Sequence, residues 1–450
     1  MGQETPDQAT KASSHHPSTH SAVPSHQPSS INHQLILRAR VVLPIRCPPI
    51  EDGAVVVAGN RIAAVGRWRF IRARHSGPVL DLGPAIVMPG LVNAHCHLDY
   101  TSMAGLFPPP RSFCDWIKSI TTEKSRWGYS DFAQSWLDGA RMLLRTGTTT
   151  VADIEAEPQL LPEVWTATPL RVFSLLEMTG IRSRRDPMQI LAEAVTKIDS
   201  LPRHRSTAGL SPHAPYSTLP LLLRRTGAAV RRRKWIAATH VAESAAEFEM
   251  FMHGRGEMFD WLQRSQRDMS DCGGVSPVQH LERAGLMGRH LLAAHVNYLA
   301  DGDARLLGRK RVSVVHCPRS HDYFRHEAFP RRALAKAGVN VCLGTDSLAT
   351  VRKHPRANLE LNMFHELRSF GARHSGVSPE RIVSMATVNG ALALGLGGKV
   401  GELRKTAFAD LIALPFAGRL RESYDAVLQH PGPVAASMIG GAWAIPPDSA

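Results

Sequence analysis

The sequence lacks any apolar stretch of about 18 residues, so no membrane-spanning helix is expected. Cysteine is scarce, and no Cys-x-x-Cys pair occurs; the six cysteines are Cys47, Cys96, Cys114, Cys272, Cys317 and Cys342. This argues against a disulfide scaffold, a zinc ribbon and thioredoxin-like chemistry, and it favours reduced thiols in a cytoplasmic protein. The N-terminus has no basic segment followed by an apolar core, so a secretory signal is not expected.

Acidic residues are outnumbered, with 39 Asp and Glu against 53 Lys and Arg, which gives a formal net charge of +14. This balance suits nucleic acid, an anionic membrane or an anionic substrate as partner, although an ordinary basic surface is the favoured interpretation. The densest basic run, residues 224–234, fits the solvated face of an outer helix better than a nucleic-acid site. The paired His-x-Glu and Pro-Cys-x-x-Cys motifs of polynucleotide deaminases do not occur. A basic nucleic-acid-binding protein remains an alternative from another class.

The composition changes along the chain in a way that predicts domains. Residues 1–33 are rich in Ser, Thr, Pro, His and Gln and have almost no large apolar side chains, which predicts a disordered tail. Residues 34–88 and 397–450 contain short apolar runs with tight turns and are expected to pair into one small β-sandwich domain. Between residues 89 and 396, apolar runs alternate with helical stretches such as 378–395. This alternation predicts an α/β fold, and a (β/α)8 TIM barrel fits its length.

Polar side chains end nearly every apolar run of this predicted barrel. They are His95, His97, His213, His240, Glu243, His295, His316 and Asp346. The carboxyl ends of the strands in such a barrel meet on one face, so residues far apart in sequence can share a site there. A single histidine at a strand end is more often an ordinary polar residue, but the repetition of the pattern favours a common centre.

His95 and His97 form a His-x-His pair, whose side chains point the same way from an extended chain and can chelate one ion. Neutral imidazoles together with one carboxylate suit a divalent metal, with Zn²⁺ as the default and Fe²⁺ as the alternative. The stretch around His213 has no lysine that could bridge two ions after carboxylation, so a single metal is expected. A metal-binding protein without catalysis is a further alternative.

The motifs PGLVNAHCHLDY, SPHAPYS, THVAES, HCPRS and LGTDS together resemble the amidohydrolase superfamily. They are most similar to its branch of cytosine, guanine and S-adenosylhomocysteine deaminases and triazine chlorohydrolases. The resemblance covers about residues 35–445 and implies a metal-dependent barrel joined to a small β-sandwich. The metal ligands that it implies are His95, His97, His240 and Asp346. It also implies that Glu243 shuttles protons, that His295 and Asp346 act on the attacking water, and that His213 contacts the substrate.

The reaction implied by this resemblance is hydrolytic deamination of a heteroaromatic ring. Water adds to the ring carbon that bears the amino group, Glu243 protonates the adjacent ring nitrogen, and ammonia leaves. The strings HCHLDYTSMAGL and HCPRSH-x-x-F are most similar to the aminodeoxyfutalosine deaminases of the futalosine route to menaquinone. Their substrate is a 6-aminopurine nucleoside with a carboxylated aromatic group, and Arg111 or Arg319 could pair with that carboxylate. Trp116 stands in the loop that grips the far end of the substrate in relatives.

Substrate identity stays open at this point, because His321 stands where many relatives have asparagine. Deaminases of S-adenosylhomocysteine, methylthioadenosine or guanine, and chlorohydrolases, use the same catalytic groups and remain alternatives. The expected partner is a small aminated heterocycle or nucleoside. Nucleic acid and membrane are not expected as partners, and a homodimer is left open.

Overall fold

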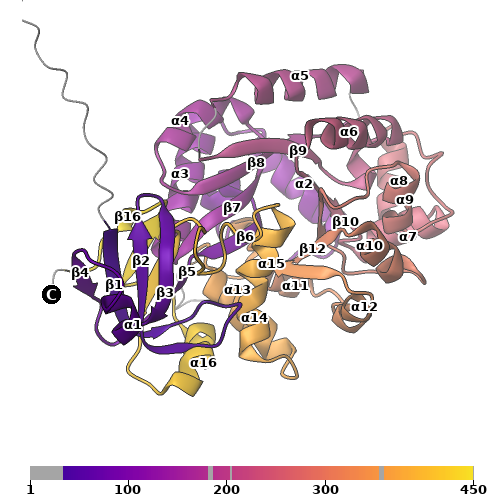
Figure 1. The fold of residues 1–450 in the computed structure, drawn as a ribbon. Helices are drawn as coiled ribbons and strands as arrows, with labels where there is room; N and C mark the ends of the chain where they lie inside the picture. Colours follow the sequence, from indigo (N-terminus) through magenta and orange to yellow (C-terminus); the bar gives the residue numbers. More distant parts are fainter. Residues whose placement is uncertain (1–33, 181–185, 203–204, 354–358, 449–450) are drawn as a thin grey trace, which may run out of the picture. The chain divides into compact units, whose positions relative to one another are not determined.

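The computed structural model describes residues 34–180, 186–202, 205–353 and 359–448. The predicted disordered tail, residues 1–33, lies outside the described residues. Within the described ranges the strands form two eight-stranded sheets, one parallel and one mixed (Figure 1). None of the helices described in these ranges is long and apolar enough to cross a membrane.

The parallel sheet is a nearly closed barrel in which sequential strands are neighbours. Its strands are β6 (Leu91–Cys96), β7 (Thr148–Glu155), β8 (Arg171–Met178), β9 (Thr207–Pro212), β10 (Ala237–Val241), β11 (Leu291–His295), β12 (Ser313–His316) and β13 (Asn340–Leu343). The first and last strands approach each other where the amides of Thr345 and Asp346 donate to the His95 carbonyl at 3.0 and 3.1 Å. A Cβ atom at Gly344 would lie 2.7 Å from that carbonyl oxygen, so only glycine fits this close approach. The predicted (β/α)8 barrel is therefore confirmed.

The barrel strands are buried on both sides, as parallel strands are when helices cover them. Their interior is filled by Val92, Ala152, Leu175, Ala238, Leu292 and Val315. The helices of this part are α2 (Phe113–Lys124), α3 (Tyr129–Arg145), α4 (Leu161–Thr166), α5 (Pro187–Ser200), α6 (Pro220–Arg233), α7 (Ala245–His253), α8 (Glu257–Arg264), α9 (Pro277–Arg283), α10 (Asp303–Lys310), α11 (Pro318–Phe324), α12 (Arg331–Lys336), α13 (Met363–Arg373), α14 (Pro379–Met385) and α15 (Val388–Ala393). Short 3₁₀ turns are η1 (Leu98–Met103), η2 (Pro158–Leu160), η3 (Pro215–Ser217) and η4 (Leu348–Thr350).

The helical stretch predicted over residues 378–395 is two helices, α14 and α15, because the backbone leaves helical geometry at Thr387 (φ −136°, ψ −96°). The break leaves the Ala386 carbonyl free of a helical partner, and this carbonyl accepts the Val92 amide at 2.8 Å. The interruption thereby ties α14 and α15 to the first barrel strand.

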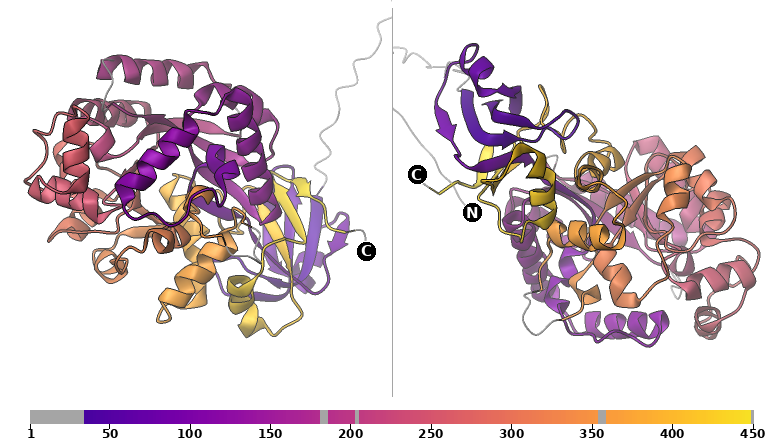
Figure 2. Two further views of the ribbon diagram at one scale, coloured as in Figure 1. Left: turned by 180° about the vertical axis from the view of Figure 1, so that it is seen from behind. Right: turned by 90° about the horizontal axis from the view of Figure 1, so that it is seen from below.

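The mixed sheet is made from both flanks of the barrel, as the sequence predicts. Its strands are β1 (Gln34–Val42), β2 (Ile50–Ala58), β3 (Arg61–Arg67), β4 (Val79–Asp81), β5 (Ala85–Pro89), β14 (Leu411–Pro415), β15 (Ala436–Ile439) and β16 (Ala442–Ile445). In Figures 1 and 2 the indigo strands of the first flank lie beside the yellow strands of the second, since β14 pairs with β5. Apolar side chains of β1, β2, β5, β14 and β15 share one core. The short helices α1 (Trp68–Arg72) and α16 (Ser423–Gln429) and the turn η5 (Leu420–Glu422) belong to these flanks.

A buried ion pair joins the two sheets. Arg171 of β8 donates from Nε and from a terminal guanidinium nitrogen to Asp410, at 3.1 and 3.2 Å, and Asp410 also accepts the Gly440 amide at 2.7 Å. Both charged side chains are nearly inaccessible, so each depends on the other to remain ionised in the interior. The flank sheet is thus fixed against the outside of the barrel.

Candidate active site

Histidines and carboxylates from distant parts of the chain meet at the carboxyl end of the barrel. His95 and His97 come from the end of β6, and His240 and His295 from the ends of β10 and β11. Asp346 follows β13 after a short loop. All five side chains are buried. The predicted convergence of strand ends therefore occurs in the structure.

Two groups of donor atoms in this cluster could each hold a metal ion. The ring nitrogens of His95, His97 and His240 lie within 4.8 Å of one another, and so do donor atoms of His95, His295 and Asp346. The Nε2 atoms of His97 and His240 face each other at 3.2 Å, and Asp346 Oδ1 lies 3.7 and 3.6 Å from Nε2 of His95 and His97.

The chemistry of these donors fits a divalent metal. Burial, with the neighbouring imidazoles, lowers the pKa of His95, His97 and His295 well below the usual range, which keeps the rings neutral. His95 Nε2 is buried and has no hydrogen-bond partner among the described residues. Neutral, converging and unpartnered imidazole nitrogens beside one carboxylate are the ligand set that Zn²⁺ and related ions bind.

Neighbouring groups orient the ligands. His240 Nδ1 donates to the His213 carbonyl at 2.8 Å, which leaves Nε2 free to face the cluster. Thr350 Oγ1 donates to Asp346 Oδ2 at 3.2 Å, so the other carboxylate oxygen faces the histidines. Left-handed backbone conformations at His295 (φ 70°) and Asp346 (φ 53°) turn the chain sharply at these strand ends.

Glu243 lies beside the cluster as a buried acid. Its Oε1 is 3.6 Å from His295 Nε2. Burial raises the pKa of Glu243 well above its usual range, and the nearby carboxylates of Asp346 and Glu247 raise it further. A carboxyl group in this position keeps its proton near neutral pH and can donate it to a bound molecule.

A cavity of about 840 Å³ opens onto this cluster. The cluster side contributes His97, His213, His240, Glu243 and Asp346, and one wall is formed by α2, including Trp116. His213 is half-buried with Nδ1 2.6 Å from Ser217 Oγ, and burial lowers the pKa of His213 to about 4. The volume is that of a pocket for a drug-sized molecule.

The two predicted carboxylate-binding arginines do not line this cavity. Arg111 is exposed. Arg319 is turned towards Glu366, with Nε 2.5 Å from Oε1, and another guanidinium nitrogen donates to the Glu360 carbonyl at 3.1 Å. The buried Glu366 needs a cation, and Arg319 supplies it.

Among the described residues, the cations that line the cavity are Lys118 and Lys124, which sequence reasoning did not single out. Lys124 donates to the Tyr100 hydroxyl and lies 3.8 Å from Glu177 Oε1. Although burial acts to raise the pKa of Glu177, Lys124 and nearby histidines hold it below its usual value. The sequence could have placed Lys124 beside the predicted substrate contact Trp116, because Trp116, Ile120 and Lys124 follow the four-residue spacing of one helix face.

His316, like His213, is a strand-end histidine outside both donor groups. Its ring stacks on Phe329 with the ring centroids 3.9 Å apart. It joins neither group of donor atoms, and it does not line the cavity. The position of a histidine at a strand end thus identifies a candidate ligand without deciding which way its ring points.

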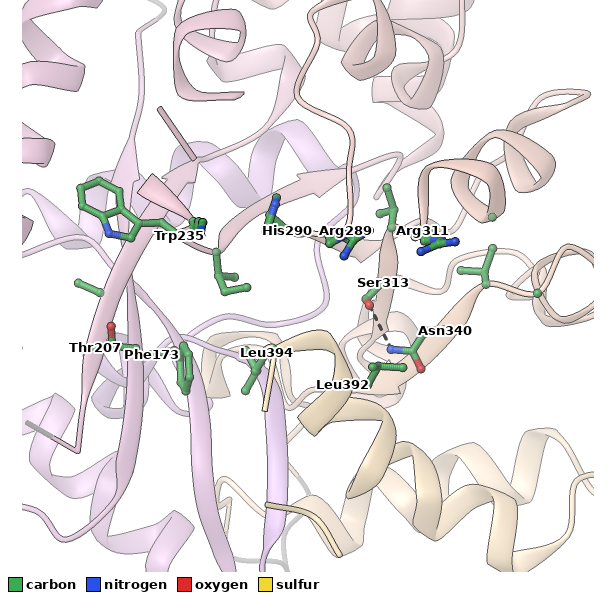
Figure 3. A pocket seen from close by; sticks show the side chains of 18 residues that line it. Phe173, Thr207, Trp235, Arg289, His290, Arg311, Ser313, Asn340, Leu392 and Leu394 are labelled. Atoms are coloured by element: carbon green, nitrogen blue, oxygen red, sulfur yellow. Dashed lines mark hydrogen bonds between the residues drawn. The ribbon is translucent and has the colours of Figure 1, made fainter. Parts of the chain in front are cut away.

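A second cavity, of about 670 Å³, lies at the opposite, amino end of the barrel strands (Figure 3). Its cationic lining residues are Lys234, Arg289 and Arg311, all exposed, and none of the described residues that line it is acidic. In Figure 3, Trp235 lies on one side of the view and the two arginines on the other. Among the described residues that line it, none is a carboxylate and His290 is the only imidazole, so this cavity has no donor cluster that could hold a metal ion.

The structure thus has a (β/α)8 barrel with buried donor groups at its carboxyl end that could hold a metal ion. The Amidohydrolase family matches residues 86–443, and the chain belongs to this family. It is accordingly a hydrolase that acts on carbon–nitrogen bonds.

Among curated relatives, a 5-methylthioadenosine/S-adenosylhomocysteine deaminase of Syntrophobacter fumaroxidans is 31% identical over 81% of this chain and 80% of its own. Among solved structures, aminofutalosine deaminase of Helicobacter pylori with methylthio-coformycin has a TM-score of 0.80 at 21% identity, covering 91% of this chain and 100% of its own. A Xanthomonas campestris adenosine deaminase with bound zinc has a TM-score of 0.78 at 24% identity, covering 92% of this chain and 93% of its own. At these identities the two structural likenesses show the fold.

Proposed function

We propose that this protein is a metal-dependent deaminase of a 6-aminopurine nucleoside, with Zn²⁺ held by His95, His97, His240 and Asp346. The observation that carries the proposal is the position of Glu243. It is a buried acid with a raised pKa, it lies 3.6 Å from His295, and it lines the same cavity as the imidazole cluster. An acid beside a metal site is what hydrolysis of a ring amidine requires, since a ring nitrogen must be protonated while water attacks the adjacent carbon.

The bound metal would lower the pKa of a water molecule and so supply the nucleophile. Asp346, whose Oδ1 faces the histidines, would accept a proton from the attacking water. Glu243 donates its proton to the purine nitrogen next to the amino-bearing carbon. Asp346 would then pass its proton to the amino group so that ammonia leaves, and the remaining hydroxyl proton would return to Glu243 as the 6-oxo group forms. The products are the 6-oxopurine nucleoside and ammonia, and both carboxyl groups regain their starting protonation states. His295, whose Nε2 lies 3.6 Å from Glu243 Oε1, would contact the attacking water.

Aminodeoxyfutalosine is the first substrate to test, because the HCHLDYTSMAGL and HCPRSH-x-x-F strings are most similar to deaminases of that nucleoside. The carboxylate contact would fall to Lys118 or Lys124 rather than to Arg111 or Arg319, since the lysines line the cavity. Methylthioadenosine and S-adenosylhomocysteine are the second candidates, because the curated relatives carry the name of their deaminase. We further propose a cytoplasmic location; a homodimer is a separate proposal that gel filtration would test.

The test is metal analysis of the purified full chain, followed by ammonia release from a panel of compounds. The panel contains aminodeoxyfutalosine, methylthioadenosine, S-adenosylhomocysteine, adenosine, guanine and cytosine. We expect bound Zn²⁺ and release from at least one 6-aminopurine nucleoside, with aminodeoxyfutalosine giving the highest kcat/KM. Release from guanine or cytosine alone would contradict the nucleoside proposal, and a metal-loaded protein that releases ammonia from none of the six would overturn deamination.

A further inference from the structure

Buried side chains bind both the backbone amide and the backbone carbonyl of Glu243. Asn297 Nδ2 donates to the Glu243 carbonyl at 2.9 Å, and the Glu243 amide donates to Glu247 Oε2 at 2.9 Å. Asn297 and Glu247 are both buried, with 5% and 0% of their surfaces exposed. Hydrogen bonds in such an environment fix geometry strongly, because no water competes for either partner.

Asn297 reaches Glu243 because two strand ends are joined to each other. After β11 the chain passes through left-handed conformations at His295 and Val296, and after β10 it does so at Ala242. The Val296 amide donates to the Val241 carbonyl at 3.0 Å, and the Asn297 amide donates to the Ala242 carbonyl at 2.9 Å. The backbone and the side chain of Asn297 therefore both bind the turn that carries Glu243.

A third strand end completes the network through His321. His321 lies on α11, after β12, and its Nδ1 is 3.0 Å from Asn297 Oδ1. Because that amide oxygen can only accept, Nδ1 must carry the hydrogen. Burial lowers the pKa of His321 to about 4, so the ring is neutral and donates from this nitrogen. The orientation of the Asn297 amide, with nitrogen towards Glu243 and oxygen towards His321, follows from this arrangement.

We propose that Asn297 and His321 are positioning residues for Glu243, acting in series through its backbone carbonyl. This inference rests on the proposed role of Glu243 as the proton donor. It explains the departure noted in the sequence: His321 stands where many relatives have asparagine, and both side chains can place an N–H at the same distance from the backbone.

Holding Glu243 by its backbone has a chemical advantage over holding its carboxyl group. A donor bound permanently to a carboxylate oxygen favours the ionised form, and the proton needed for transfer would be lost. Contacts to the peptide unit fix the base of the side chain and leave both carboxyl oxygens available for the proton. A displacement of about 1 Å at a catalytic group can cost about 100-fold in rate, so this constraint matters even though it is remote from the reacting atoms.

The experiment compares asparagines of similar chemistry at the two ends of the barrel. Asn340, at the start of β13, also donates to a backbone carbonyl, that of Asn389 at 3.0 Å, and to Ser313 Oγ at 3.1 Å (Figure 3). Asn297→Ala, Asn340→Ala, His321→Leu and His321→Asn are prepared as metal-loaded full-length protein. The readouts are kcat and KM on the best nucleoside of the panel, metal content, melting temperature, and amide hydrogen exchange of residues 241–248.

We expect Asn297→Ala and His321→Leu to lower kcat by about 10- to 100-fold while KM and metal content stay close to wild type. Exchange over residues 241–248 should rise in both. His321→Asn should restore kcat and protection, because it returns a donor to Asn297 Oδ1. Asn340→Ala should lose a similar hydrogen bond and similar stability with unchanged kcat.

Equal kcat losses in Asn297→Ala and Asn340→Ala would overturn the proposal and indicate a general effect on stability. So would failure of His321→Asn to differ from His321→Leu. If the wild-type protein releases no ammonia from any nucleoside, the proposed function fails, and hydrogen exchange alone decides the positioning roles. Increased exchange confined to Asn297→Ala and His321→Leu supports them, and unchanged exchange contradicts them.

Discussion

The two ends of the barrel strands differ in the burial of their ionisable groups. At the carboxyl end, His240, His295 and Glu243 are buried, and their side chains converge on a cavity or on one another. At the amino end, Arg289 and Arg311 line a cavity of similar size but are exposed (Figure 3). Solvated charges interact weakly, whereas buried groups perturb each other strongly and change their protonation states. Burial of converging groups, more than their number, therefore distinguishes the carboxyl end from the amino end.

The largest contrast between the ends is expected for matched histidines. His240 is the penultimate residue of β10, and His290 immediately precedes β11 at the amino end. His240→Ala should lose metal and lower ammonia release by about 1,000-fold or more, because an imidazole of the donor cluster is gone. His290→Ala should retain both. Metal analysis and kinetics check this prediction. Full metal content in His240→Ala would show that His240 is no more important for metal binding than His290.

The next effect concerns the acid itself. Glu243→Gln should lower kcat by about 100- to 10,000-fold with the metal retained, because glutamine keeps the size of the side chain and cannot transfer the proton. Glu249→Gln, which removes a half-exposed carboxylate from nearby α7, serves as the control and should leave kcat unchanged. Full activity of Glu243→Gln in a metal-loaded protein would remove Glu243 from the mechanism.

A smaller effect is expected on stability as the pH falls. Burial keeps the pKa of His316 well below that of an unfolded histidine, so the unfolded chain takes up a proton near pH 6.5 and the folded chain does not. The stability present above pH 6.5 should therefore be lost progressively as the pH falls below 6.5, by at most about 1.4 kcal/mol per pH unit for this residue.

His316→Phe, which preserves stacking on Phe329 and cannot titrate, should therefore show a smaller drop in melting temperature between pH 7.5 and 5.0 than wild type. His290→Gln, at the amino end, should change this drop less, because His290 is only partly buried. Identical drops in melting temperature in His316→Phe and wild type would show that burial of neutral His316 does not lower stability at acidic pH.

The smallest effect is expected at the basic cavity. The double variant Arg289→Gln/Arg311→Gln should leave kcat and KM on the best nucleoside unchanged, since neither guanidinium lies near the imidazole cluster. Steady-state kinetics at low and high salt would check this. A marked rise in KM at low salt alone would indicate that the basic cavity helps attract an anionic substrate. The amino end would then also contribute to substrate binding.

The sequence predicted the barrel and the convergence of its strand ends because both follow from local patterns. Each apolar run is a strand, and the residue at its end, such as His240 or Asp346, is placed by topology. The direction in which a side chain points, in contrast, depends on residues far away in the sequence. Arg319 was predicted to reach the substrate, yet the buried Glu366, 47 residues further along the chain, binds its guanidinium.

The contacts that hold Glu243 were equally out of reach of sequence reasoning. Asn297 reaches the Glu243 carbonyl only because left-handed turns follow both β10 and β11, and nothing in the string AAHVNYL predicts a positive φ at His295. Ser244 and Glu247, by contrast, have the Ser-x-x-Glu spacing of a capping box at the start of α7, so a contact from Glu247 back to an amide before the helix could have been predicted.

The pairing of β14 with β5 has a consequence for the order in which the protein matures. Leu411 pairs with Pro89, so during synthesis β5 leaves the ribosome long before its partner has been made. Its hydrogen-bonding edge stays open through translation of the whole barrel, and an open strand edge is where chains associate wrongly. Only Gly90 separates β5 from β6, the strand that presents His95 and His97. We therefore expect metal to be loaded by the finished chain, after its last strands have closed the sheet.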